Sequence, residues 1–103
     1  MALELRPNCE LCDKDLPADA AEARICSYEC TFCVECAEGA LANVCPNCGG
    51  GFVPRPIRPR GEWRDGTGLA HDPPGARRRS LRYPEAEIVV LVEQLRGVDP
   101  RDR

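Results

Sequence analysis

The sequence predicts a small, metal-stabilised α+β domain, and three observations support this fold class. All eight cysteines lie between Cys9 and Cys48 and form four close pairs, enough ligands for two four-cysteine zinc sites. Residues 1–53 contain few large apolar side chains, and so short a segment needs metals or disulfides to fold. Between the pairs, the residue patterns favour short strands and one short central helix.

The chain begins with an expected extended segment, residues 1–8, that leads into the first cysteine pair. Cys9 and Cys12 are separated by two residues, a spacing that lets a tight turn direct both sulfurs at a metal about 2.3 Å away. A loop follows, in which Leu16 is the expected buried anchor, and a short strand is predicted at Arg24–Ile25.

The next two pairs are so close together that the two metal sites must interlock or abut. Cys30 is separated from Cys33 by only two residues. Residues 34–42 favour a short helix with one apolar face, although Gly39 weakens it by about 1 kcal/mol relative to alanine. After the last pair, a closing strand is predicted at Phe52–Val53. The second, third and fourth pairs are Cys26/Cys30, Cys33/Cys36 and Cys45/Cys48.

Zinc is the preferred interpretation of the eight cysteines, and the expected compartment is the reason. The N-terminus has no apolar run of the signal-peptide type, and no stretch approaches the roughly 20 apolar residues of a membrane span. We therefore expect a cytoplasmic protein. In a reducing compartment, C-x-x-C pairs are more often metal ligands than structural disulfides. Disulfide or redox use and an iron–sulfur centre are the alternatives.

Residues 54–83 are predicted to be an irregular linker, because prolines and glycines exclude a long helix or a paired strand and X-Pro repeats favour extended backbone. The linker also carries most of the arginines, so nucleic acid is a candidate partner. The alternative is that these arginines neutralise the acidic first half of the chain. They are Arg55, Arg58, Arg60, Arg64, Arg77, Arg78, Arg79 and Arg82.

An amphipathic helix is predicted over residues 84–97, followed by a tail, residues 98–103. Pro84 suits the first helical position and Gly97 the position just after the helix. A helix this short is marginal alone in water, so its apolar stripe needs a partner. That partner is the zinc module, another protein or a second copy in a homodimer. The stripe consists of Ile88, Leu91, Val92 and Leu95.

The cysteine spacing resembles the RING type of zinc module. The segment from Cys30 to Cys33 is similar to the His-x-Phe-Cys stretch of that family, with Cys30 in place of the histidine, and Cys45-Pro46-Asn47-Cys48 is similar to its closing pair. LIM-like modules share the middle spacing but usually have longer loops. The resemblance implies a treble-clef or cross-brace architecture, whereas spacing alone leaves consecutive sites open. It implies one zinc on Cys9, Cys12, Cys33 and Cys36 and another on Cys26, Cys30, Cys45 and Cys48.

Residues 1 to about 52 also resemble a bacterial family described as a domain of unknown function, number 1272. The resemblance rests on the opening MALELRPNCE, on DKDLP, on EARICSYECTFCVECAE and on VCPNCGG. It implies zinc binding and a fold, but no activity.

The expected function is that of a non-catalytic, zinc-held interaction or adaptor module. The chain shows no Ser/His/Asp set, phosphate loop or carboxylate pair in a convincing context, and we expect no enzyme activity. His71, the only histidine, lies in the linker and is expected at a solvent-exposed turn. The RING resemblance would imply ubiquitin-ligase activity. This activity is disfavoured because Gly49 replaces the usual basic residue after the last cysteine.

Overall fold

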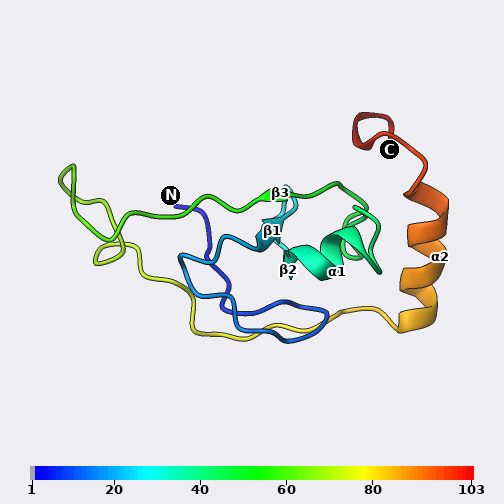
Figure 1. Cartoon of the computed structure of the whole chain (residues 1–103), viewed down its shortest axis with the longest axis horizontal. Helices are drawn as coiled ribbons and strands as arrows, with labels where there is room; N and C mark the ends of the chain where they lie inside the picture. Colours follow the sequence, from blue (N-terminus) through cyan, green and yellow to red (C-terminus); the bar gives the residue numbers. More distant parts are fainter. Residues whose placement is uncertain (1) are drawn as a thin grey trace.

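The computed structural model describes residues 2–103, so position 1 of the expected zinc module, residues 1–53, lies outside the described residues. The molecule measures 45 × 26 × 20 Å, with an irregular loop at one end of its long axis and a helix at the other (Figure 1). Between them lies a small sheet. Within the described chain, no helix is both long and apolar enough to span a bilayer.

The sheet has three short antiparallel strands in the order β2-β1-β3. They are β1 (Ala23–Ile25), β2 (Thr31–Cys33) and β3 (Val53–Pro54). In β1, Arg24 lies opposite Phe32 of β2 and Pro54 of β3. The two predicted strands are confirmed, the second one residue later than expected. The five residues between β1 and β2 form the hairpin that carries Cys26 and Cys30.

The central helix α1 (Val34–Glu38) is shorter than the expected helix over residues 34–42. The chain leaves the helix at Gly39, and the following residues form turns in which Ala42 and Asn43 adopt positive φ angles of 46° and 63°. These turns direct Leu41 and Val44 into the core, where they are 1% and 0% exposed. Burial of these two side chains therefore outweighs continuation of the helix.

The apolar core is small and is shared with the cysteines. Phe32 is completely buried and makes an edge-to-face contact with Phe52, with ring centroids 5.3 Å apart. Leu16 is 1% exposed, which confirms it as a buried anchor. Because so few side chains form this core, the cysteine sulfurs occupy positions that aliphatic residues fill in larger domains.

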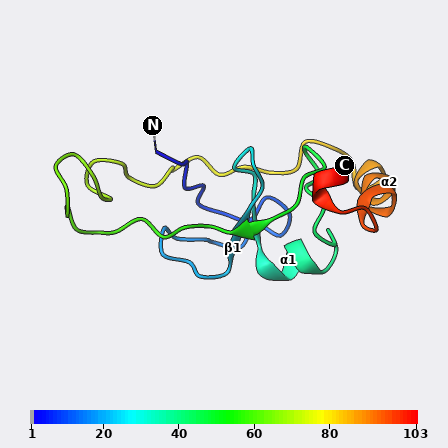
Figure 2. The ribbon, with the colours of Figure 1, turned by 90° about the horizontal axis from the view of Figure 1, so that it is seen from above.

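Helix α2 (Glu85–Leu95) confirms the predicted C-terminal helix and lies across one end of the module (Figures 1 and 2). Ile88 and Val92 are buried in the same core cluster as the cysteines, while Leu91 and Leu95 pack against it partly buried. After α2, the short 3-10 helix η1 (Pro100–Asp102) brings Arg103 to the last cysteine loop, where its guanidinium donates hydrogen bonds to the carbonyls of Asn43 and Gly49.

The expected linker has no helix or strand beyond Pro54, yet it is attached to the first half of the chain along much of its length. Arg55 is buried and donates to the carbonyls of Arg6, Leu16 and Pro17. Farther along, the backbone N–H of Gly75 donates to the Leu5 carbonyl at 2.9 Å. The segment is therefore irregular but fixed by hydrogen bonds.

Truncation of Val92 tests how much α2 contributes to stability. Val92 is 4% exposed, whereas Val89, three residues earlier in the same helix, is 53% exposed. We expect Val92→Ala to lower the free energy of unfolding by about 1–3 kcal/mol through lost burial and a residual cavity. Val89→Ala should change it by less than about 0.5 kcal/mol. Urea unfolding at a fixed free zinc concentration measures both, and equal effects would show that α2 is not anchored through Val92.

Candidate metal centres

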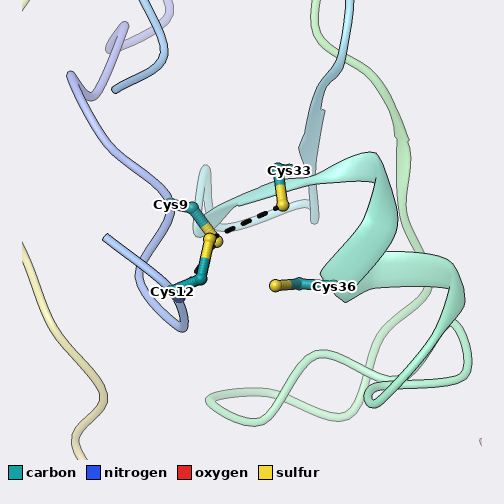
Figure 3. A group of neighbouring side chains, drawn as sticks. All are labelled: Cys9, Cys12, Cys33 and Cys36. Atoms are coloured by element: carbon teal, nitrogen blue, oxygen red, sulfur yellow. Dashed lines mark hydrogen bonds between the residues drawn. The ribbon is translucent and has the colours of Figure 1, made fainter. Parts of the chain in front are cut away.

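The first cysteine set brings together Cys9, Cys12, Cys33 and Cys36, whose sulfurs all lie within 4.8 Å of one another (Figure 3). Two come from the first loop, one from the end of β2 and one from α1. The Sγ atoms of Cys12 and Cys33 are 3.8 Å apart. Four sulfurs at about 2.3 Å from a tetrahedral zinc are separated from one another by about 3.8 Å, so this set fits the ion.

The second set brings together Cys26, Cys45 and Cys48, whose sulfurs also lie within 4.8 Å of one another. Cys30 is outside that common distance but lies close enough to Cys26 and Cys45 to shift the pKa of both thiols. The structure thus places the expected fourth ligand beside the set. The grouping interleaves the cysteine pairs, first with third and second with fourth, as the cross-brace arrangement requires.

Backbone amides point at the sulfurs of both sets. The amide of Cys12 is 3.5 Å from the Cys9 sulfur, and those of Tyr28 and Gly50 are 3.3 and 3.4 Å from the sulfurs of Cys26 and Cys48. Such N–H donors stabilise thiolates, which are the form of cysteine that binds metal. The tight turns of the cysteine loops position these amides.

The thiols of the second set shift one another's pKa values in opposite directions. Hydrogen bonds with Cys30 and Cys45 lower the pKa of Cys26 to about 3, and the corresponding contacts with Cys26 and Cys30 raise the pKa of Cys45. Adjacent thiolates repel one another, so ionising all the sulfurs of this set is unfavourable without a cation. A divalent cation reduces the repulsion between the thiolates by neutralising part of their charge, so the donor set suits Zn²⁺.

The first set shows a similar division. Burial raises the pKa of Cys9 and Cys36, whereas a hydrogen bond from the backbone amide of Lys14 lowers the pKa of Cys12. Cys12 is also the exposed member of the set. Full ionisation of this set would place adjacent negative charges partly out of water, so it again needs a cation.

Glu10, which the sequence analysis did not identify, links three of the cysteine loops. Its carboxylate is almost completely buried and accepts hydrogen bonds from Arg6 at 3.0 Å, from the backbone N–H of Thr31 at 2.6 Å and from Asn47 at 3.3 Å. Thr31 lies between Cys30 and Cys33, and Asn47 between Cys45 and Cys48. One side chain therefore fixes the relative positions of loops that supply both metal centres.

Asn8 is a second structural residue that the sequence analysis missed. Its side chain is fully buried and its amide nitrogen donates to Asp13 Oδ1 and to the Arg79 carbonyl. The backbone N–H of Arg79 donates in return to Asn8 Oδ1 at 3.0 Å. Both missed residues are polar and adjacent to Cys9. A polar residue beside the first ligand cysteine is the sequence signal that could have identified them.

The remaining expected positions are more dispersed. His71 lies in the exposed loop, as predicted, with its Nε2 2.9 Å from a carboxylate oxygen of Glu62. Within the described residues, the groups capable of holding a metal contain cysteine alone, so His71 belongs to neither set. Five of the eight linker arginines hydrogen-bond within the chain through their side chains. These five are Arg55, Arg58, Arg60, Arg78 and Arg79.

Replacement of Glu10 should destabilise both metal centres together. Glu10→Ala leaves the buried Arg6 guanidinium and the Thr31 amide without this acceptor, and we expect a loss of about 3–5 kcal/mol in the free energy of unfolding. Glu38→Ala, at an exposed position of α1, should have little effect. Chelator competition on the zinc-loaded variants measures the metal affinity of each site. A loss confined to one site would contradict the linking role of Glu10.

The interleaved pairing of the cysteines can be tested with cadmium in place of zinc. We expect correlation spectra between ¹¹³Cd and the cysteine protons to link one metal to Cys9, Cys12, Cys33 and Cys36 and the other to the remaining four. Cys30→Ser should reduce the bound metal from about two ions per chain to about one. Correlations joining Cys9 and Cys26 to the same cadmium would establish consecutive sites instead.

Comparisons with known proteins place this cysteine-rich region in a family. The sequence profile described as "Protein of unknown function (DUF1272)" matches residues 2–58. An uncharacterized protein of Rhizobium meliloti (strain 1021) is 63% identical over 57 residues, which cover 55% of this chain and 68% of that protein. No solved structure gives a significant match. Because the matched residues include both cysteine sets, the chain belongs to the DUF1272 family of proteins of unknown function.

Proposed function

We propose that this protein is a non-catalytic, protein-binding module whose shape is held by two zinc ions. The observation that carries the proposal is the pair of all-cysteine sets, which offer seven clustered sulfurs and Cys30 beside them. Four-cysteine zinc sites are structural, because every coordination position belongs to the protein. Their role is to fix the surrounding surface.

The donor sets argue against a catalytic metal. A catalytic zinc keeps one position for water or substrate and usually takes histidine or carboxylate ligands. In residues 2–103 neither cluster contains such a residue, and His71 interacts with Glu62 instead. These cysteine sets therefore favour structural metal sites over catalytic ones.

The exposed side chains support a role in protein contact. Trp63 and Tyr28 are 79% and 71% exposed, and large aromatic residues are the side chains that contribute most to protein interfaces. Val89 and Val90 lie on the outer face of α2. The inner stripe of α2 already packs against the module, so a homodimer stays a prediction that requires the helix to leave its site. The residues of that predicted contact are Ile88, Leu91, Val92 and Leu95.

The nucleic-acid alternative receives less support from the contacts. Arg78 bridges Asp13 and Asp15, with N–O distances of 2.9 and 2.6 Å, and Arg79 pairs with Glu4. These arginines neutralise acids of the first half of the chain, as the alternative interpretation of the linker expected. Nucleic-acid binding would rest chiefly on Arg64, Arg77 and Arg82, whose guanidinium groups make no hydrogen bond among the described side chains.

Metal removal and substitution test the scaffold role. Because zinc competes with protons for the thiolates, we expect a chelator to unfold residues 9–48, and to do so at lower concentration as the pH falls. Cys45→Ser should also unfold this region. In the cobalt-substituted protein, added azide or thiocyanate should leave the visible spectrum unchanged, since a closed site has no position for them. A spectral shift would indicate an open, potentially catalytic site.

A further inference from the structure

The segment that follows β3, residues 54–60, has the sequence Pro-Arg-Pro-Ile-Arg-Pro-Arg and forms neither helix nor strand after Pro54. Proline fixes its own φ near the polyproline II value and directs the preceding residue to extended backbone. Three prolines in seven residues therefore restrict most of the segment to an extended form. In both ribbon views it runs along an outer edge of the molecule (Figures 1 and 2).

The burial of this segment follows the period of a polyproline II helix, which has about three residues per turn. Arg55 and Arg58, three positions apart, turn inward, being buried and half-buried. Pro56 and Pro59 are both exposed, and Ile57 is 53% exposed. One of the three ridges thus faces the protein and the other two face solvent.

The inward ridge is anchored by hydrogen bonds. Arg55 donates to three backbone carbonyls of the first half of the chain, and Arg58 donates to the carbonyls of Asp72 and Leu3. The guanidinium groups thereby hold the backbone in place without covering the two outer ridges. A segment fixed in this way loses little conformational entropy when it binds a partner.

Arg60 lies on the same outer ridge as Pro54 and Ile57. Its side chain is 84% exposed, and its contact with Asp19 is a long one of 3.5 Å between exposed groups. Such a pair contributes at most about 1 kcal/mol, so the guanidinium is free to pair with a carboxylate of another protein. The segment therefore combines two exposed prolines with an available cation at one end.

We propose that residues 54–60 are a preformed ligand for a polyproline-binding domain, one with a groove lined by aromatic side chains and an acidic residue at one end. Proline-rich segments spaced as Pro56 and Pro59 are recognised by such grooves because their conformation is already extended. Arg60 would pair with the acidic residue. The inference deepens the proposed interaction role and rests on it.

The test uses the full zinc-loaded chain, labelled with ¹⁵N, and a panel of purified polyproline-binding domains of the SH3 and WW types. We expect at least one domain with an acidic groove to shift the amides of Ile57, Arg58 and Arg60 saturably. Pro56→Ala combined with Pro59→Ala should weaken that binding at least tenfold, and Arg60→Glu should do the same. The matched control, Pro73→Ala with Pro74→Ala at exposed prolines elsewhere, should stay within twofold.

A further variant distinguishes the arginine that anchors the segment from the prolines that would contact the partner. Arg58→Met keeps all three prolines and removes an inward anchor, so we expect weaker binding and broadened amide signals over residues 57–60 while two zinc ions remain bound. If a zinc-loaded chain shifts none of these amides with any domain of the panel, or if the proline variant binds as tightly as the wild type, the inference is overturned. The zinc-held scaffold would stand in that case, because its own test is metal binding.

Discussion

The buried carboxylate of Glu10 is the interaction on which the arrangement of the cysteine loops depends. The cysteine loops have little regular structure. Two metal ions alone would hold the sulfur atoms in position but would not fix the backbone of the loops. Glu10 adds a connection that the metals do not provide, since it joins the first loop to the backbone beside Cys30 and to the last loop at Asn47. Burying a carboxylate is costly unless it is fully paired, and the nearby Arg6 guanidinium meets that requirement.

Much of the grouping of the cysteines could be predicted from the sequence because cysteine spacing is a local signal. Pairs separated by two or three residues are typical ligands of one metal, and the closeness of the two central pairs predicted that the two sets interlock or abut. The interleaved grouping was implied by the resemblance to RING modules, because spacing alone leaves consecutive sites open. The anchoring of the linker could not be predicted in this way. Arg55 and Arg79 look like ordinary solvated arginines in a proline-rich stretch, and their partners lie 39 and 71 residues away along the chain. Composition correctly predicted that the linker has an irregular backbone. It could not predict that the linker is hydrogen-bonded to the first half of the chain.

The charge distribution has a structural explanation in these attachments. A four-cysteine zinc site would add about two negative charges to an already acidic half of the chain, and the arginines of the second half lie against that half. Arg78 and Arg79 contact acids near the first cysteine loop, whereas Arg55 and Arg58 donate to backbone carbonyls. The arginines therefore divide between neutralising charge and satisfying buried backbone groups. Only the first of these roles depends strongly on salt concentration.

The exchange of hydrogen bonds between Asn8 and Arg79 has a consequence for the order in which the protein folds. The two residues are 71 positions apart, so closing this loop early would cost considerable chain entropy, whereas each cysteine loop closes over a short stretch. During synthesis, the cysteine-rich half also leaves the ribosome before residue 79 does. The cysteine-rich half is therefore expected to assemble first and to provide the surface onto which the arginine-rich segment and α2 then dock.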